Sequence, residues 1–348
     1  MTVGARLAAS LLLLALSTSA WAKKVDLDYH VKLLPQSDQA EVRLSLSQGS
    51  AVRSLNFDLG RDGDYSDFKA DGQWQVMPGN TPGASRGLWQ PSADKASLTY
   101  RVRLTHARKK GVYEASMTPG WALFRGEDLV PTARLDQQDG IELVSRLVFE
   151  LPAGWKSVET SWPRIGKNKF RIDNVSRLFD RPTGWMLAGT LGSRRMRLGE
   201  TEITVASPKG QGMHRMDVLT LLTFVWPQVQ AAFPRHPAKL LVVGGSDPMR
   251  RGAYSARDSI YLNSRTPLVS ENGSSPLIRE VVQAIGRFND QQGSDWISEG
   301  LAQYYAIELM RRAGGISDDR YAALQTRLAK EGRDVTTLRV EHASGATV

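Results

Sequence analysis

The sequence contains no cysteine and only five histidines among its 348 residues. Without cysteine the chain forms no disulfide, offers no thiolate to a metal and lacks a site for lipid attachment. The histidines are equally uninformative about catalysis. His30 and His106 lie in or beside strand patterns. His214, His236 and His342 fall outside the two helices that are expected between residues 276 and 314.

Long hydrophobic runs are also missing. The most apolar stretch, Leu7–Leu16, is too short to span a bilayer as a stable anchor. Arg6 precedes this stretch and Ala20–Ala22 follows it as an A-x-A cleavage site, so we expect residues 1–22 to be an export signal and the mature chain to begin at Lys23. The sequence therefore predicts a periplasmic or secreted protein without a stable membrane anchor.

No long run of a single charge is present, although the formal net charge is +9. Short basic clusters, at Arg108–Lys110 and Arg194–Arg195, are typical of hairpin tips rather than of nucleic-acid sites, so we expect no nucleic-acid partner. The remaining composition is that of a globular protein, with 41% hydrophobic and 23% charged residues, and the length suits two domains. The oligomeric state is left open.

Residues 23 to 208 alternate apolar and polar side chains with the period of two that is typical of strands, beginning with Val25, Leu27 and Tyr29. Segments rich in turn formers, such as 60–64 and 78–87, separate these runs. The pattern predicts an N-terminal antiparallel β-sandwich domain at 23–208. Its tryptophans are either core residues or contact residues for a partner, and the three of interest are Trp74, Trp89 and Trp121.

The pattern changes near residue 209. Apolar residues from Met216 to Val229 recur at helical spacing, and this helix should bend or restart at Pro227 and end before Pro234. The apolar runs 239–245 and 259–263 predict buried strands. Residues 252–263 form either a plain hairpin or an exposed edge strand to which a peptide could add.

Two helices are expected between residues 276 and 314. Pro276 suits a first helical turn, Ser274 and Ser275 suit a cap, and apolar residues at helical spacing then continue to about Arg287. After a break at 293–295, a second and longer helix begins near Trp296 and ends near Gly314. A last helix should cover 318–330.

The second of these helices carries a recognisable motif. Its sequence WISEGLAQYY, Trp296–Tyr305, resembles the W-x-x-E-G-x-A-x-Y-Y helix of the gluzincin metallopeptidases, the group that contains the alanyl and glycyl aminopeptidases. The resemblance implies an α+β fold in which the β-sandwich is followed by a thermolysin-like peptidase domain at 209–348. It also implies a cleft near Trp296, Tyr304 and Tyr305. The chain reaches Val348 without the further helical segment of the group, so we expect this domain to be short at its C-terminus.

The resemblance further implies a zinc site, but the sequence departs from it. Gluzincins bind zinc through the two histidines of H-E-x-x-H and through the glutamate that corresponds to Glu299, and the glutamate of H-E-x-x-H is the general base. Here Glu280 keeps the general-base position, whereas Arg279 and Gln283 replace the histidines. A guanidinium stays protonated in proteins and a neutral amide is a poor zinc ligand, so we expect no zinc.

The altered positions suggest a function without metal chemistry. If the helices pack as in the gluzincins, Arg279 should reach Glu299 and Glu280 in the space of the ion, with Gln283 completing the hydrogen bonds. This favours an exported pseudopeptidase that binds a peptide or an envelope protein. The alternatives are a metal-dependent hydrolase with non-standard ligands, and an envelope binding module that works through its β domain.

Overall fold

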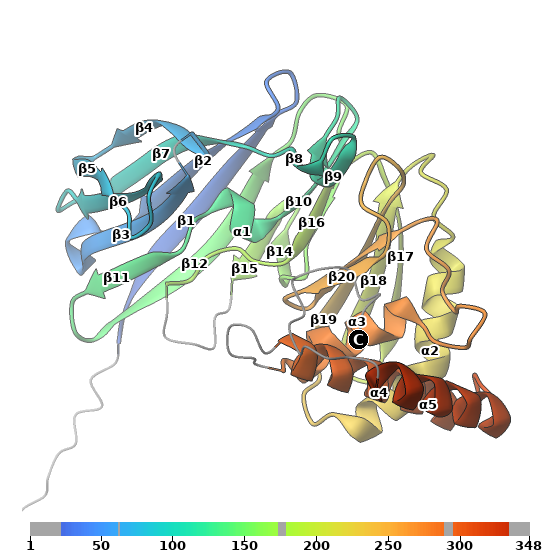
Figure 1. Ribbon diagram of the computed structural model, residues 1–348. Coiled ribbons are helices and arrows are strands. Elements are labelled where there is room, and N and C mark those ends of the chain that lie inside the picture. The colour runs from blue at the N-terminus through green and yellow to red at the C-terminus, as the bar shows by residue number, and fades with distance from the viewer. Residues whose placement is uncertain (1–21, 62, 173–178, 289–294, 334–348) are drawn as a thin grey trace, which may run out of the picture.

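The computed structural model describes residues 22–61, 63–172, 179–288 and 295–333. The predicted export signal lies outside the described residues except for Ala22. Strands dominate most of the chain, and the longer helices gather beside the last sheet (Figure 1). The predicted α+β fold is therefore confirmed. Within the described ranges, no helix is both long and apolar enough to cross a membrane.

The largest sheet has seven strands in the order β14-β15-β12-β1-β2-β7-β4. The central strands β1 and β12 run parallel, which the predicted all-antiparallel pattern did not include, and the other pairs are antiparallel. The strands, in chain order, are β1 (Lys23–Leu34), β2 (Gln39–Leu46), β4 (Tyr65–Ala70), β7 (Ala96–Arg103), β12 (Ile141–Glu150), β14 (Arg164–Gly166) and β15 (Lys169–Ile172).

Two smaller sheets complete the β-rich part. One has the order β11-β3-β6-β5 and the other β13-β16-β10-β9-β8. The strands of the first are β3 (Val52–Arg61), β5 (Gly72–Pro78), β6 (Ala84–Pro91) and β11 (Ala133–Gln137). Those of the second are β8 (His106–Lys109), β9 (Val112–Met117), β10 (Trp121–Arg125), β13 (Ser157–Glu159) and β16 (Trp185–Gly189). Two single turns lie between strands, η1 (Gly49–Ala51) and α1 (Gly126–Leu129).

One apolar core joins these three sheets, because the alternate residues of their strands face one another and exclude water. Trp89 is completely buried in it, so this tryptophan is a core residue and not a contact residue. Trp74 packs against the edge of the same core and stacks on Phe68, with ring centroids 4.5 Å apart. Trp121 is half-buried.

The last sheet has the order β17-β18-β19-β21-β20 and leaves β20 at one edge. Its strands are β17 (Leu191–Leu198), β18 (Thr201–Pro208), β19 (Lys239–Gly245), β20 (Ala253–Ala256) and β21 (Ser259–Asn263). Strands β18, β19 and β21 are parallel neighbours, whereas β17 and β20 run antiparallel to theirs. The predicted division at 208/209 falls inside the segment that builds this sheet, and the domain boundary itself stays a prediction.

Four helices accompany the last sheet, α2 (Arg215–Ala232), α3 (Pro276–Gly286), α4 (Asp295–Arg312) and α5 (Asp318–Arg333). Their apolar faces and the sheet share a second core. Helix α2 continues through Pro227 as one element, so the helix does not restart there, and it ends before Pro234 as predicted. The expected strands at 239–245 and 259–263 are present as β19 and β21, and β20 and β21 form a hairpin whose outer strand is also the sheet edge.

Candidate functional site

Helix α3 presents the residues that correspond to the H-E-x-x-H positions. Ser275 caps the helix, since its Oγ accepts a hydrogen bond of 3.2 Å from the backbone N–H of Ile278, and Pro276 occupies the first turn. The apolar residues of α3 are buried against α4 and the last sheet. This packing holds Arg279 and Glu280 against β20 on one side and α4 on the other.

Arg279 connects the two glutamates of the motif. Its Nη2 lies 2.9 Å from Oε1 of Glu280, and its Nη1 lies 3.5 Å from Oε2 of Glu299 on α4. The structure thus brings together the three side chains whose convergence the sequence predicted. The side chain of Gln283 is half-buried and forms no hydrogen bond with any described residue, so it does not complete the network as expected. Nε of Arg279 is buried and likewise has no described partner.

Glu280 is also tied to the edge strand. It is buried, and its Oε2 accepts a hydrogen bond of 2.7 Å from the backbone N–H of Ser255 on β20. Burial raises the pKa of the Glu280 carboxyl, while Arg279 and the hydrogen bonds from Ser255 oppose this effect. Both oxygens of the carboxylate are therefore occupied by partners from the chain itself.

The aromatic residues of the α4 motif differ in their surroundings. Tyr305 packs against Phe233 and Phe288, with ring centroids 5.2 Å and 6.3 Å apart, so it belongs to the apolar core of the helices. Tyr304 is 50% exposed and Trp296 is half-buried. Their predicted role at a cleft stays a prediction.

A cavity of about 400 Å³ lies on the β20 side of this site. Ser255 belongs to its wall and connects it to Glu280 through the hydrogen bond described above. The lining residues are Glu114, Arg125, Glu127, Trp185, Arg250, Tyr254, Ser255, Ala256 and Tyr261. Trp185 is the first residue of β16 and therefore also comes from the β-rich part.

Three charged residues of the cavity come from the β-rich part and were missed by sequence reasoning. Glu127 accepts hydrogen bonds of 2.9 and 3.1 Å from the N–H of Gly184, Arg125 pairs with Asp128, and Glu114 pairs with Arg250. They lie far from the α3 and α4 motifs in sequence and carry no motif of their own. Only the packing of the two parts of the chain places them beside Ser255.

The residues at the positions of the gluzincin zinc ligands do not fit a zinc ion. Of the three gluzincin ligand positions, one holds a guanidinium, one an amide and one a carboxylate, and Zn²⁺ sites in proteins use thiolate, imidazole and carboxylate donors. The guanidinium of Arg279 is itself a cation, and it contacts both remaining carboxylates. In the described ranges, no three His, Cys, Asp or Glu side chains gather closely enough to hold a metal ion.

Comparison with known proteins supports the fold. No family model and no curated protein matches the sequence. Among solved structures, an aminopeptidase N family protein from Idiomarina loihiensis is 15% identical with a TM-score of 0.62, over 85% of this chain and 56% of that one. An M1 zinc metallopeptidase from Deinococcus radiodurans is 14% identical with a TM-score of 0.52, over 94% and 79%. Leukotriene A4 hydrolase from Saccharomyces cerevisiae is 13% identical with a TM-score of 0.56, over 88% and 51%.

These likenesses establish that the chain has the fold of the M1 zinc metallopeptidases over the part that aligns, which confirms the gluzincin-like fold that WISEGLAQYY implied. The chain spans about half the length of the Idiomarina and yeast proteins. At this level of identity the likeness concerns the fold, so the activity of those proteins does not pass to this chain without further argument.

Proposed function

We propose that this chain is an exported pseudopeptidase, a protein with a gluzincin fold that binds a peptide or an envelope protein without zinc-dependent hydrolysis. The observation that carries the proposal is the position of Arg279, whose guanidinium contacts both Glu280 and Glu299. One fixed positive charge thus takes the place of the ion beside the ligand position Glu299 and the general-base position Glu280.

The chemistry of Glu280 supports the same conclusion. A general base of a zinc peptidase has to reach a metal-bound water. Here the Glu280 carboxylate is buried between Arg279 and the N–H of Ser255. Both oxygens of this carboxylate therefore already have partners in the chain, which disfavours a role as the general base.

Peptide is the ligand class that the fold favours. Strand β20 is the edge of the last sheet and borders the 400 Å³ cavity, and edge strands recognise extended peptides through their backbone groups. One structure with this fold, a mutant of the Deinococcus radiodurans M1 zinc metallopeptidase, was solved with a Tyr-Ser-Ala substrate. We infer that the cleft of this chain keeps the capacity to bind peptide.

The alternatives have less support. A hydrolase that uses Mg²⁺ or Ca²⁺ would need free carboxylates, but both carboxylates of the site already pair with Arg279. A binding module that works through the β-rich part would need exposed aromatic residues, but Trp89 is fully buried and Trp74 stacks on Phe68.

The test combines elemental analysis with a broad peptidase screen on the full chain, produced with zinc in the medium. We expect the natural protein to contain no stoichiometric zinc and to cleave no peptide. The variant R279H/Q283H restores both imidazoles beside Glu299 and should bind zinc. Stoichiometric zinc or cleavage in the natural protein would refute the proposal, and a double variant that stays metal-free would show that the geometry assumed for the three positions is wrong.

A further inference from the structure

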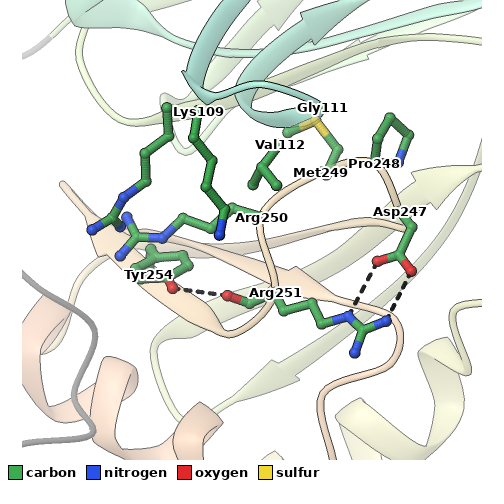
Figure 2. Close-up of a pocket in the computed structure, with 10 residues that line it drawn as sticks. Lys109, Gly111, Val112, Asp247, Pro248, Met249, Arg250, Arg251 and Tyr254 are labelled. Carbon is green, nitrogen blue, oxygen red and sulfur yellow. Dashed lines mark hydrogen bonds and ion pairs between the residues drawn. The ribbon is translucent and has the colours of Figure 1, made fainter.

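A second and larger cavity, of about 780 Å³, lies where the β8–β9 hairpin meets the loop between β19 and β20 (Figure 2). The hairpin comes from the β-rich part and the loop from the last sheet, so the cavity is built by both. The lining residues are Arg108, Lys109, Gly111, Val112, Asp247, Pro248, Met249, Arg250, Arg251 and Tyr254. We refer to it as the basic pocket.

Positive charge dominates this pocket, because its lining has four basic side chains and a single carboxylate. That carboxylate, Asp247, is shared, since it lies 3.1 Å from Arg251 and 3.2 Å from Arg265. Arg108 and Lys109 are exposed and form no ion pair with any described residue. The pocket therefore presents positive charge that the described part of the chain does not neutralise.

The walls of the pocket are held in place by backbone hydrogen bonds. The N–H of Tyr113 donates to the carbonyl of Pro248 at 3.1 Å, and the N–H of Arg250 donates to the carbonyl of Tyr113 at 2.8 Å. From the buried side, the Tyr261 hydroxyl and the Asn263 amide donate to the Arg250 carbonyl. A ligand consequently meets walls that are already ordered, which reduces the entropic cost of binding.

Arg250 is oriented as well. Its guanidinium carbon lies 3.7 Å from the centre of the Tyr254 ring, and its Nη1 lies 3.3 Å from Oε1 of Glu114. Stacking of this kind fixes a guanidinium while leaving some of its N–H groups available to acceptors.

The basic pocket adjoins the cavity beside the Arg279 site. Arg250 and Tyr254 line both cavities, and Ser255 continues the wall towards Glu280. The two ends differ in charge, because the smaller cavity also contains Glu114 and Glu127. Arg125 and Arg250 balance these two carboxylates, so only the basic pocket has an excess of positive charge. A peptide with acidic side chains at one end would meet a suitable charge in each part.

We propose that the basic pocket binds the acidic side chains of a peptide whose remainder lies along β20 in the smaller cavity. This inference rests on the proposed peptide-binding function and names the class of peptide. Asp and Glu side chains accept hydrogen bonds from Arg108, Lys109 and Arg250, and the pairing of carboxylate with guanidinium supplies specificity.

The experiment measures fluorescence anisotropy of the full chain with two labelled peptides, one made of Asp, Glu and Ala and the other its Asn, Gln and Ala counterpart. We expect tighter binding of the acidic peptide, weakened by added salt. The variant R108Q/K109Q should weaken that binding by about fivefold to tenfold, since two contacts with the ligand are lost. The matched control R194Q/R197Q removes the same charge from β17, at the edge of the last sheet opposite β20, and should change the affinity by less than about twofold.

The possible results separate this inference from the function on which it rests. Equal binding of both peptides, unchanged by R108Q/K109Q, would overturn the assignment of the basic pocket and leave peptide binding intact. Binding of neither peptide would count against the proposed function as well. Tighter binding of heparin than of the acidic peptide, lost in R108Q/K109Q, would identify a polyanion site and overturn the inference.

Discussion

Two clusters of arginine and acidic side chains on neighbouring helices differ in the balance of their charges. On α3 and α4, the single cation Arg279 lies between the carboxylates of Glu280 and Glu299. Near the end of α4, the carboxylate of Glu308 lies between two cations, at 2.9 Å from Nη2 of Arg311 and 2.6 Å from Nε of Arg312. Arg311 also lies 3.5 Å from the exposed Asp318, so this cluster has as many cations as carboxylates.

This difference affects the protonation equilibrium of the glutamate. Burial raises the pKa of Glu280, Arg279 and the hydrogen bonds from Ser255 oppose this effect, and the charge of Glu299 adds to it. Hydrogen bonds from Arg311 and then Arg312 lower the pKa of Glu308 to about 2 despite its partial burial. Two arginines thus outweigh the burial of Glu308, whereas the single arginine beside Glu280 does not outweigh the burial of that carboxyl.

Removal of Arg279 should have the largest effect on stability. In R279A the buried Glu280 loses the one cation that pairs with it among the described residues, so we expect unfolding in urea at neutral pH to need about 3 kcal/mol less free energy. The loss should shrink as the pH is lowered, because a protonated Glu280 is neutral.

The control is the double variant R279M/E280Q, which removes both charges and keeps an acceptor for the N–H of Ser255. It should recover most of the stability that R279A loses. If R279A were as stable as the natural protein at neutral pH, the account of Arg279 as a replacement for the metal charge would fail.

The pH should change the stability that the Glu308 cluster contributes by less than R279A changes it, and in a direction that the pKa of Glu308 fixes. A folded pKa of about 2, below the ordinary 4.5, means that the unfolded chain takes up a proton first. The stability that Glu308 contributes is therefore present above roughly pH 4.5 and is lost as the pH falls towards 2, by about 1 kcal/mol after allowance for solvent screening.

The measurement compares urea unfolding of the natural protein and E308Q in this acidic range. The difference in the free energy of unfolding between the two proteins should be present near the upper end of this pH range and vanish near its lower end. A difference that does not depend on pH would mean that Glu308 acts by packing and not by its charge.

Removal of one of the two arginines should have the smallest effect. In R312A the Glu308 carboxylate keeps Arg311, and the Arg312 side chain is 54% exposed, so the loss should be about 0.5 kcal/mol in thermal or urea unfolding. A loss as large as that of R279A would contradict the idea that the ratio of cations to carboxylates distinguishes the two clusters.

Local sequence was sufficient for the helices and their caps. The apolar spacing predicted α3 and α4 to within a few residues, and Ser275 caps α3 as expected. The replacements at 279 and 283 were visible in the sequence alone, because ligand chemistry depends on residue type. Even the approach of Arg279 to Glu299 followed, since the helix pair of a known fold prescribes which positions converge.

Other features depended on contacts between distant parts of the chain. Strand β1 pairs with β12, and Glu114 pairs with Arg250. The β8–β9 hairpin meets the loop before β20. Each of these contacts joins segments that local sequence patterns cannot relate. The sequence by itself determined the helices, the altered metal positions and the lack of thiolate chemistry, because these depend on residue type and near-neighbour spacing. Only the tertiary structure decided which charges face the cleft. It also decided that Gln283 stays outside the Arg279 network. The reason is that long-range packing sets the distances over which charges and hydrogen bonds act.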